Sequence, residues 1–193
     1  MDCFVINLAR DKERWEQTSA ALRPYPWLRV HRVEAIDGRT LMPSRIERDR
    51  GDPRFLGRLG CQLSHAIAWR EAMHTPGPYS LILEDDSNPH DLDLLTEAPD
   101  GYDIVWVNDR ACQARRDREN IGTDGYLVSP TGAEWLLDLF NRDGFGGHLD
   151  ARMWAYKKDG SLGATTLDRP VTYHDMQAPS SRHHIDVMGR DGP

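Results

Sequence analysis

The sequence predicts a three-layer α/β domain with a mainly parallel central sheet. Short apolar runs that suit buried strands alternate along the chain with segments of helical spacing, and this alternation is typical of βαβ units. The length of 193 residues fits one compact domain, which can bury a core without a disulfide framework. No internal repeat, low-complexity tract or linker divides the chain. We therefore expect residues 1–193 to form a single domain.

The chain begins with a predicted strand and helix. Phe4–Leu8 is a short apolar run of the kind found in strands that are buried on both faces of a parallel sheet. Asp11 can cap a helix that runs to about Leu22. A second strand is expected at 28–35, followed by turn residues at 36–39.

A basic segment separates these elements from the middle of the chain. Residues 43–58 contain five arginines, with proline, glycine and little apolar periodicity, so we expect a mobile loop there with at most a short helix. The arginines could face an anionic substrate, although such runs are more often simply solvated. Helical spacing returns at 60–73, and another strand is expected at 79–83.

The second half continues the alternation. Strands are expected at 103–107 and 126–128, and Pro130 opens a helix that runs through Phe140. The remaining expected elements are a helix at 149–157, short strands at 164–167 and 171–173, and a polar tail at about 177–193.

Composition excludes several classes of protein. With 24 basic and 31 acidic side chains the formal net charge is −7, which argues against a dedicated nucleic-acid-binding protein. No apolar stretch approaches the roughly 18 residues of a transmembrane helix, and the N-terminal run at 3–9 lacks the basic flank of a signal peptide. Cys3, Cys61 and Cys112 are odd in number and widely spaced, so we expect reduced thiols and a cytoplasmic location.

Three consecutive carboxylates, those of Glu84, Asp85 and Asp86, follow the strand expected at 79–83. Open α/β sheets bind ligands at the C-terminal ends of their strands, and hard divalent cations need oxygen ligands. One or two of these carboxylates could hold Mg²⁺ or Mn²⁺ and so bridge the phosphates of a substrate. The alternative is a solvated acidic turn in which Asp86 or Ser87 caps a helix.

Two further groups of residues could belong to a site. Cys61 and His65 are four residues apart on the predicted helix at 60–73 and could share a metal, or they belong to a polar helix start that packs under the site. Arg10 and Arg14 follow the first strand and could grip a phosphate or stack on a base, although a plain surface role is equally consistent. The chain has no GxxxxGK[ST], GxSxG, HExxH or strand-linked GxGxxG motif, which disfavours P-loop, α/β-hydrolase and Rossmann dehydrogenase chemistry.

Four motifs occur in the order found in one protein family. They are Val5-Ile6-Asn7-Leu8 leading to Arg10 and Arg14-Trp15, Val33-Glu34-Ala35-Ile36-Asp37-Gly38-Arg39, Gly60-Cys61-Gln62-Leu63-Ser64-His65 with Trp69, and Leu81-Ile82-Leu83-Glu84-Asp85-Asp86. Similar segments follow at Gly125–Ser129, Gly132-Ala133, Leu136-Leu137, Pro170, Gln177 and Ser180-Ser181. The ordered set resembles the family 25 glycosyltransferases, which include bacterial lipooligosaccharide galactosyltransferases and collagen galactosyltransferases.

The resemblance implies a GT-A type nucleotide-binding sheet and the inverting transfer of a hexose, usually galactose from UDP-galactose. It also implies Mn²⁺ or a similar cation such as Mg²⁺ at the acidic motif, where Glu84 and Asp86 occupy the first and third positions of a DxD-like pattern. Asp124 stands where the family pattern leads us to expect a small or neutral residue. We expect the nucleotide-sugar donor to contact Asn7, Arg10, Arg14, Asp37, Gly38, Ser64, His65, Glu84, Asp85, Gln177 and Ser181.

For the mechanism we expect a single displacement, in which a carboxylate takes the proton of the acceptor hydroxyl as that hydroxyl attacks the anomeric carbon. Asp150, which follows a glycine-rich turn, is the first candidate for this base and Asp124 is the second, although either could instead cap a helix. His174 follows the strand expected at 171–173 and could complete the metal shell, or it is a hydrogen-bonded loop histidine.

Two other classes of function stay open. A metal-dependent nucleotide or sugar-phosphate hydrolase could use the same carboxylates, and an inactive module could bind UDP without turnover. For a transferase, the acceptor could be a glycan, a small molecule or a peptide side chain.

Overall fold

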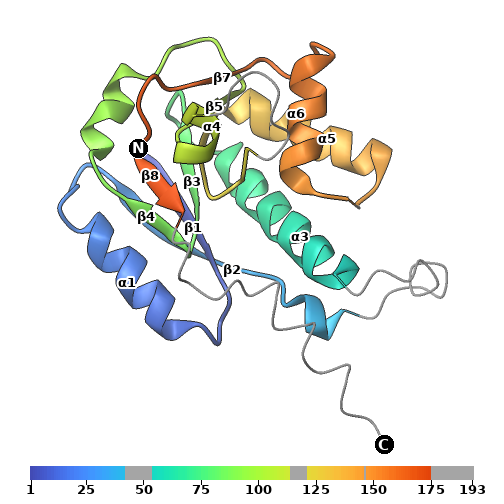
Figure 1. The fold of residues 1–193 in the computed structure, drawn as a ribbon, viewed down its shortest axis with the longest axis horizontal. Coiled ribbons are helices and arrows are strands. Elements are labelled where there is room, and N and C mark those ends of the chain that lie inside the picture. The colour runs from blue at the N-terminus through green and yellow to red at the C-terminus, as the bar shows by residue number, and fades with distance from the viewer. Residues whose placement is uncertain (42–53, 114–120, 146, 175–193) are drawn as a thin grey trace, which may run out of the picture.

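The computed structural model of this chain describes residues 1–41, 54–113, 121–145 and 147–174 (Figure 1). Within these residues a main sheet has six strands in the order β2-β1-β3-β6-β5-β7, and β4 pairs with β8 in a small second sheet. The strands are β1 (Asp2–Asn7), β2 (Arg29–Glu34), β3 (Ser80–Glu84), β4 (Ser87–Pro89), β5 (Ile104–Trp106), β6 (Gly125–Val128), β7 (Ala164–Thr166) and β8 (Thr172–His174).

The main sheet is mixed but mainly parallel, as the sequence predicts. β1 runs parallel to β2 and to β3, and β5 runs parallel to β7. β6 is antiparallel to both of its neighbours, β3 and β5. Because Gly125 at the start of β6 pairs with Leu83 near the end of β3, the residues that precede β6 lie beside the acidic motif.

Helices cover both faces of the sheet, which gives the three layers expected from the sequence (Figure 1). On one face Trp69 and Leu136 pack against Ile82, and on the other face Leu22 packs in a cluster with Leu81. Neighbouring residues of β3 thus face opposite layers, which explains its uninterrupted apolar sequence. The helical elements are α1 (Lys12–Leu22), η1 (Gly38–Thr40), α3 (Phe55–Ala72), η2 (Leu92–Glu97), α4 (Asp109–Gln113), α5 (Pro130–Asp143) and α6 (Leu149–Lys158).

α3 begins earlier than its apolar spacing predicts. The buried Phe55 starts the helix inside the range expected to be a loop, while residues 43–53 of that range and the expected tail at 177–193 lie outside the described residues. The first turns of α3 pack closely on η1, since a Cβ on Gly38 would clash with the Leu56 carbonyl oxygen and one on Gly60 would lie 2.7 Å from that of Ile36. Glycine at both positions therefore fixes the segment around η1 against α3.

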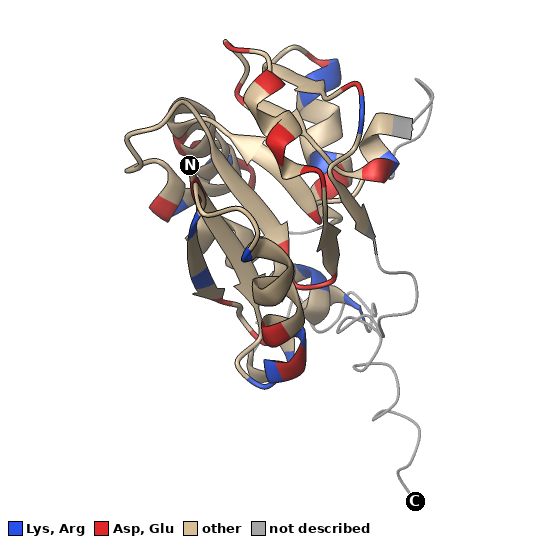
Figure 2. Cartoon of the chain, turned by 90° about the vertical axis from the view of Figure 1, so that its left-hand side faces the viewer, with Lys and Arg blue, Asp and Glu red and all other residues tan. Residues whose placement is uncertain are grey.

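Three short elements, β4, η2 and α4, have no counterpart in the sequence prediction, because they carry too few residues to show a hydrophobic period. Charged residues lie mainly on the helices and loops, while the central strands carry few of them (Figure 2). Among the described residues, the helices are all too short or too polar to cross a membrane.

Candidate active site

A pocket opens where β1 and β3 end. The register of these parallel strands pairs Ile6 with Glu84, so both strands deliver polar residues to one edge of the sheet. Most of the expected donor-contacting residues that the structure describes come together here, whereas Gln177 and Ser181 lie outside the described residues. The pocket is lined by Ile6, Leu8, Arg10, Ala35, Ile36, Asp37, Gly38, Gly57, Cys61, Ser64, His65, Glu84 and Asp85.

Glu84 is contacted from α3 and from the segment before β6. Its Oε1 accepts a hydrogen bond of 2.6 Å from the Thr123 hydroxyl, in the segment before β6, and lies 3.3 Å from Nε2 of His65 on α3. Its side chain is 17% exposed and lines the pocket. The carboxylate is thus oriented from two sides while it still faces the pocket.

His65 belongs to a buried chain of hydrogen bonds. Trp69 Nε1 donates to the Tyr126 hydroxyl at 2.8 Å, and the same hydroxyl lies 2.8 Å from Nδ1 of His65. Burial raises the pKa of Tyr126 well above its ordinary value, so the hydroxyl keeps its proton and can donate it to Nδ1. In that arrangement Nε2–H of His65 donates to Glu84, and the chain ends at the acidic motif.

Asp85 points toward α1. Its Oδ2 accepts from Asn7 Nδ2 at 2.6 Å, its Oδ1 from Arg14 Nη1 at 3.2 Å, and its backbone carbonyl from the Thr18 hydroxyl at 3.1 Å. Burial raises the pKa of Asp85, which the bonds from Asn7 and Arg14 offset only in part. Although Asp85 lines the pocket, its carboxylate contacts serve to join β3 to α1.

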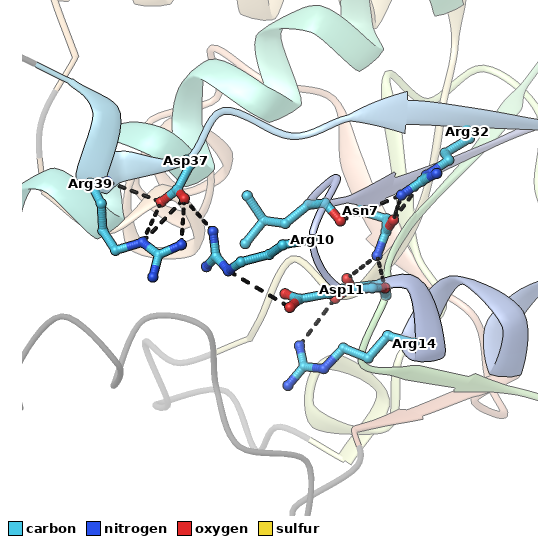
Figure 3. A network of polar contacts seen from close by, with 9 residues as sticks. Asn7, Arg10, Asp11, Arg14, Arg32, Asp37 and Arg39 are labelled. Carbon is cyan, nitrogen blue, oxygen red and sulfur yellow. Dashed lines mark hydrogen bonds and ion pairs between the residues drawn. The ribbon is translucent and has the colours of Figure 1, made fainter.

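Asn7 connects this network to β2 (Figure 3). Its Nδ2 also donates to the Asp11 carbonyl at 2.9 Å, and its Oδ1 accepts from Arg32 Nε at 2.9 Å. Asn7 is 1% exposed, so its side chain links β2, β3 and the start of α1 through buried hydrogen bonds.

Asp86 lies outside the first pocket. It lines a second hollow together with Arg14, Thr18 and residues of β4. Glu84 therefore lines the first pocket and Asp86 the second, while the charges of both carboxylates act on Arg110.

Asp37 binds two arginines (Figure 3), and both Asp37 and Arg10 line the first pocket. Its carboxylate forms ion pairs with Arg10 and, at 2.7 Å, with Arg39, and its Oδ1 accepts from the Arg39 backbone N–H at 3.1 Å. Hydrogen bonds from Arg39 lower the pKa of Asp37, with burial opposing the shift and Arg10 adding to it. The cluster fixes η1 and places cationic groups beside the pocket.

Ser64 has a structural task. Its hydroxyl accepts from the Ile36 backbone N–H at 2.8 Å and donates to the Gly60 carbonyl at 2.6 Å. The side chain is 1% exposed, so it supports the pocket wall that leads to Asp37 and Gly38.

Asp124 is buried beside Glu84 with an exposure of 1%. Its Oδ1 is ion-paired with Arg110 and accepts from Asn108 Nδ2 at 3.3 Å, and its Oδ2 has no hydrogen-bond partner among the described residues. Burial raises the pKa of Asp124, against the lowering effect of Arg110. Burial would lower the pKa of Arg110, but the carboxylates of Asp124, Glu84 and Asp86 together raise it.

Asp150 lies at the start of α6 and is partly exposed. Its Oδ2 is 3.4 Å from the backbone N–H of Gly122, which directly precedes Thr123, and its Oδ1 accepts from the Ala151 N–H at 2.9 Å. Gly122 and Thr123 thus connect Asp150 with Glu84. His174 of β8 pairs with Ser87 of β4, which places its backbone next to Asp86 in the sheet register.

The sequence reasoning did not single out Thr123, Trp69 or Tyr126 for the polar network around Glu84. The position of Thr123 could have indicated a site residue, because Thr123 immediately precedes the candidate Asp124 and a predicted strand. The hydroxyl of Tyr126 carried none, since an aromatic residue in an apolar run is indistinguishable from ordinary core.

Comparison with known proteins adds a family assignment. Residues 1–91 match the model of the family described as "Glycosyltransferase family 25 (LPS biosynthesis protein)". Procollagen galactosyltransferase 2 from Homo sapiens is 26% identical over 157 residues, covering 70% of this chain and 25% of that protein. The Mus musculus protein of the same name is 33% identical over 157 residues with the same coverage. The match therefore covers only 25% of the length of each of these curated relatives.

Solved structures confirm the GT-A type α/β fold. A glycosyltransferase involved in glycosylation of the major capsid of PBCV-1 has a TM-score of 0.58 at 10% identity, covering 96% of this chain and 98% of that one. An active-site mutant of LgtC has a TM-score of 0.55 at 10% identity, covering 100% and 98%. A mutant of Drosophila beta-1,4-galactosyltransferase 7 in complex with manganese, UDP-Gal and xylobiose has a TM-score of 0.51 at 13% identity, covering 95% and 72%.

Proposed function

Because the chain contains a glycosyltransferase family 25 domain, we propose that it moves a hexose, galactose from UDP-galactose, to an acceptor hydroxyl with inversion and with the help of a divalent cation. The observation that carries this proposal is the position of the acidic motif. Glu84 and Asp86 lie at the C-terminal edge of the parallel strands, directly beside a pocket built from β1, η1 and α3.

The pocket suits the nucleoside part of a UDP-sugar. Ile6, Leu8 and Ile36 offer apolar walls for a flat base, while Asp37 and Arg10 lie at the mouth, where ribose hydroxyls and phosphates need polar partners. We propose that the donor binds here with its diphosphate toward Glu84.

The residues at the motif fit a hard divalent cation. The charges of Glu84, Asp86 and Asp124 all act on one guanidinium, that of Arg110, and Asp124 Oδ2 is buried without a hydrogen-bond partner among the described residues. Such an excess of carboxylate oxygen is the donor set that Mn²⁺ and Mg²⁺ take. Glu84 and Asp86 would hold the cation, His174 would join them from β8, and the bound cation would neutralise charge on the departing diphosphate.

Asp150 is the better candidate for the base. Asp124 is 1% exposed and ion-paired with Arg110, so an acceptor hydroxyl cannot reach it. Asp150 is partly exposed and connected through Gly122 and Thr123 to the acidic motif. We propose that Asp150 takes the proton of the acceptor hydroxyl while that oxygen bonds to the anomeric carbon and the bond to the diphosphate breaks. Asp124 would then position Arg110.

The acceptor is proposed only as a class, namely a hydroxyl of a glycan, a small molecule or a peptide. The cytoplasmic location suggested by the cysteines stays a prediction.

Donor binding can be tested by ligand-induced thermal stabilisation. The purified protein is heated with UDP, UDP-galactose, UDP-glucose, UDP-N-acetylglucosamine or GDP-mannose, each with and without Mn²⁺. We expect the largest Mn²⁺-dependent rise in Tm with UDP-galactose, about 2.7 kcal/mol of stabilisation at a concentration 100-fold above Kd. Asp86→Ala should lose this rise, and the matched control Asp138→Ala, exposed on α5, should keep it.

Turnover then separates the alternatives. Asp150→Asn should bind donor with normal affinity but transfer sugar at least about 100-fold more slowly, as expected when a general base is removed. Release of phosphate without any acceptor requirement would support the hydrolase, and UDP binding without transfer or donor hydrolysis would support the inactive module. Wild-type turnover by Asp150→Asn would exclude Asp150 as the base.

A further inference from the structure

We propose that Cys61, His65 and Glu84 form a zinc-binding site on the wall of the pocket, with a ligand set different from the oxygen site proposed for Mn²⁺ or Mg²⁺. One ligand atom from each residue, a thiol sulfur, an imidazole nitrogen and a carboxylate oxygen, lies within 4.8 Å of the other two. All three residues line the same pocket, so an ion could enter from solvent.

The backbone already sets the geometry of the three ligands. Cys61 and His65 are one helical turn apart on α3, and Glu84 ends β3, which packs beside that helix. In a tetrahedral zinc site with bonds of about 2.0–2.3 Å, neighbouring ligand atoms are roughly 3.3–3.8 Å apart. Nε2 of His65 and Oε1 of Glu84 are already 3.3 Å apart. Closing the site therefore needs the thiol to approach by no more than about 1.5 Å, which a side-chain rotation provides.

Both the imidazole and the carboxylate are oriented by outer partners. The Tyr126 hydroxyl holds Nδ1 of His65 at 2.8 Å and is itself held by Trp69, so Nε2 is directed toward the pocket and Glu84. The Thr123 hydroxyl holds Glu84 at 2.6 Å. A hydrogen bond to the far nitrogen fixes the orientation of a metal-binding histidine, and the Thr123 bond to Oε1 holds the Glu84 carboxylate in place.

The ligand types select the ion. A thiolate with an imidazole and a carboxylate is a typical zinc set, and three protein ligands leave a fourth position open to water or a ligand. Mn²⁺ and Mg²⁺ prefer oxygen ligands, so neither should compete well at the sulfur. On binding, the Cys61 thiol loses its proton to solvent as the sulfur–zinc bond forms, and the ring proton of His65 moves from Nε2 to Nδ1, where it can be donated to Tyr126.

One consequence rests on the proposed function. Glu84 would belong both to the zinc site and to the oxygen site at the acidic motif, so zinc should inhibit transfer by withdrawing Glu84 and occupying the pocket wall.

The binding test uses Co²⁺ as a spectroscopic probe for zinc and needs no enzymatic activity. Metal-free protein is titrated with Co²⁺ under reducing conditions while the near-ultraviolet thiolate-to-cobalt charge-transfer band is recorded. We expect a band that saturates at one equivalent, that Zn²⁺ displaces, and that excess Mn²⁺ leaves in place. Cys61→Ser should abolish the band, and Glu84→Gln should weaken Co²⁺ binding at least about 10-fold, since even loss of an outer partner costs that much.

The matched control is Cys112→Ser, a partly buried cysteine on α4 whose sulfur contacts the Trp106 carbonyl at 4.0 Å. It should keep the full band, and thermal unfolding should show that every variant is folded. An unchanged band in Cys61→Ser, or no band in the wild type, overturns the site. In transfer assays, the activity of each variant with zinc is divided by the activity of the same variant without zinc. If zinc inhibits Cys61→Ser as strongly as the wild type, zinc does not inhibit transfer through this site. Normal transfer without a cobalt band would reject the zinc site and leave the proposed function intact.

Discussion

The two polar networks behind the acidic motif differ in chemistry. On the α1 side, Asp85 is bound by an amide and a guanidinium, from Asn7 and Arg14. On the α3 side, Glu84 is bound by an imidazole and a hydroxyl, from His65 and Thr123. The guanidinium of Arg14 offsets the charge of Asp85, whereas the hydroxyl of Thr123 orients Glu84 without adding a charge.

Because of this difference, the neighbouring carboxylates of the motif have different roles. The α1 side anchors the motif, and the α3 side orients the carboxylate that faces the pocket. Variants on the α1 side should therefore mainly lose stability, and substitution of Glu84 should mainly lose activity.

The largest expected effect is on turnover in Glu84→Gln. The substitution keeps the shape and one acceptor oxygen, but it removes the charge that would hold the cation, which is worth several kcal/mol to the transition state. We expect kcat for sugar transfer to fall at least about 100-fold, which corresponds to roughly 2.7 kcal/mol. Tm should stay within about 4 °C of the wild type.

Glu134→Gln is the matched control, because Glu134 is exposed on α5, away from the pocket. It should leave both kcat and Tm unchanged. A Glu84→Gln variant that turns over within about threefold of the wild type would contradict this difference in roles.

Asn7→Leu should give the largest loss of stability. Leucine has nearly the shape of asparagine but cannot donate to Asp85 or accept from Arg32, and both lost bonds involve charged groups. We expect unfolding free energy to fall by about 3 kcal/mol in urea denaturation. Asn141→Ala on the exposed surface of α5 should change it by less than about 0.5 kcal/mol. Equal stability of the two variants would show that the α1 network does not anchor the motif.

The order of strands and helices could be predicted because local patterns encode it. β3 is buried on both faces and reads as a continuous apolar run, and α5 is opened by Pro130 with the Ser129 hydroxyl accepting from the Gly132 N–H at 2.9 Å. The direction of β6 could not be predicted, because no tight turn joins it to β5 and its apolar run fits either direction. That direction places Thr123 and Asp124 beside Glu84.

The sequence also grouped side chains that the structure separates. Glu84 and Asp86 were expected to hold the metal and Asp85 to contact the donor. The Asp85 carboxylate binds Asn7 and Arg14 on the α1 side, and Asp86 lines another hollow than Glu84. Ser64 was expected to contact the donor, yet its hydroxyl holds the Ile36 backbone, 28 residues away in the chain. Such long-range partners leave no trace in local spacing.

Tyr126→Phe tests the α3 network through stability. The change removes one hydroxyl that binds both the Trp69 indole and the His65 ring inside the core. Leaving these buried groups without that partner should cost about 2 kcal/mol of unfolding free energy. The control Tyr102→Phe, at a residue 39% exposed, should cost less than about 0.5 kcal/mol. A loss of that small size in Tyr126→Phe would indicate that the chain to Glu84 is not formed.

The smallest expected effects are the pH dependences of two carboxylates, Asp37 and Asp85, and they have opposite signs. The pKa of Asp37 is lowered in the folded protein, mainly by Arg39, so its ionisation stabilises the fold above the ordinary carboxyl pKa, and that contribution disappears as the pH falls through the folded value. The pKa of Asp85 is raised, mainly by burial, so the fold loses stability as the pH rises from the ordinary value through the folded value.

Urea denaturation of Asp37→Asn, Asp85→Asn and wild type between about pH 3 and 7 separates the two cases. With rising pH, the wild type should gain stability relative to Asp37→Asn, by less than about 1 kcal/mol at this partly exposed pair, and should lose stability relative to Asp85→Asn. Asp138→Asn, exposed on α5, should follow the wild type at every pH. Slopes of the same sign for the two variants would show that burial does not outweigh Asn7 and Arg14 at Asp85.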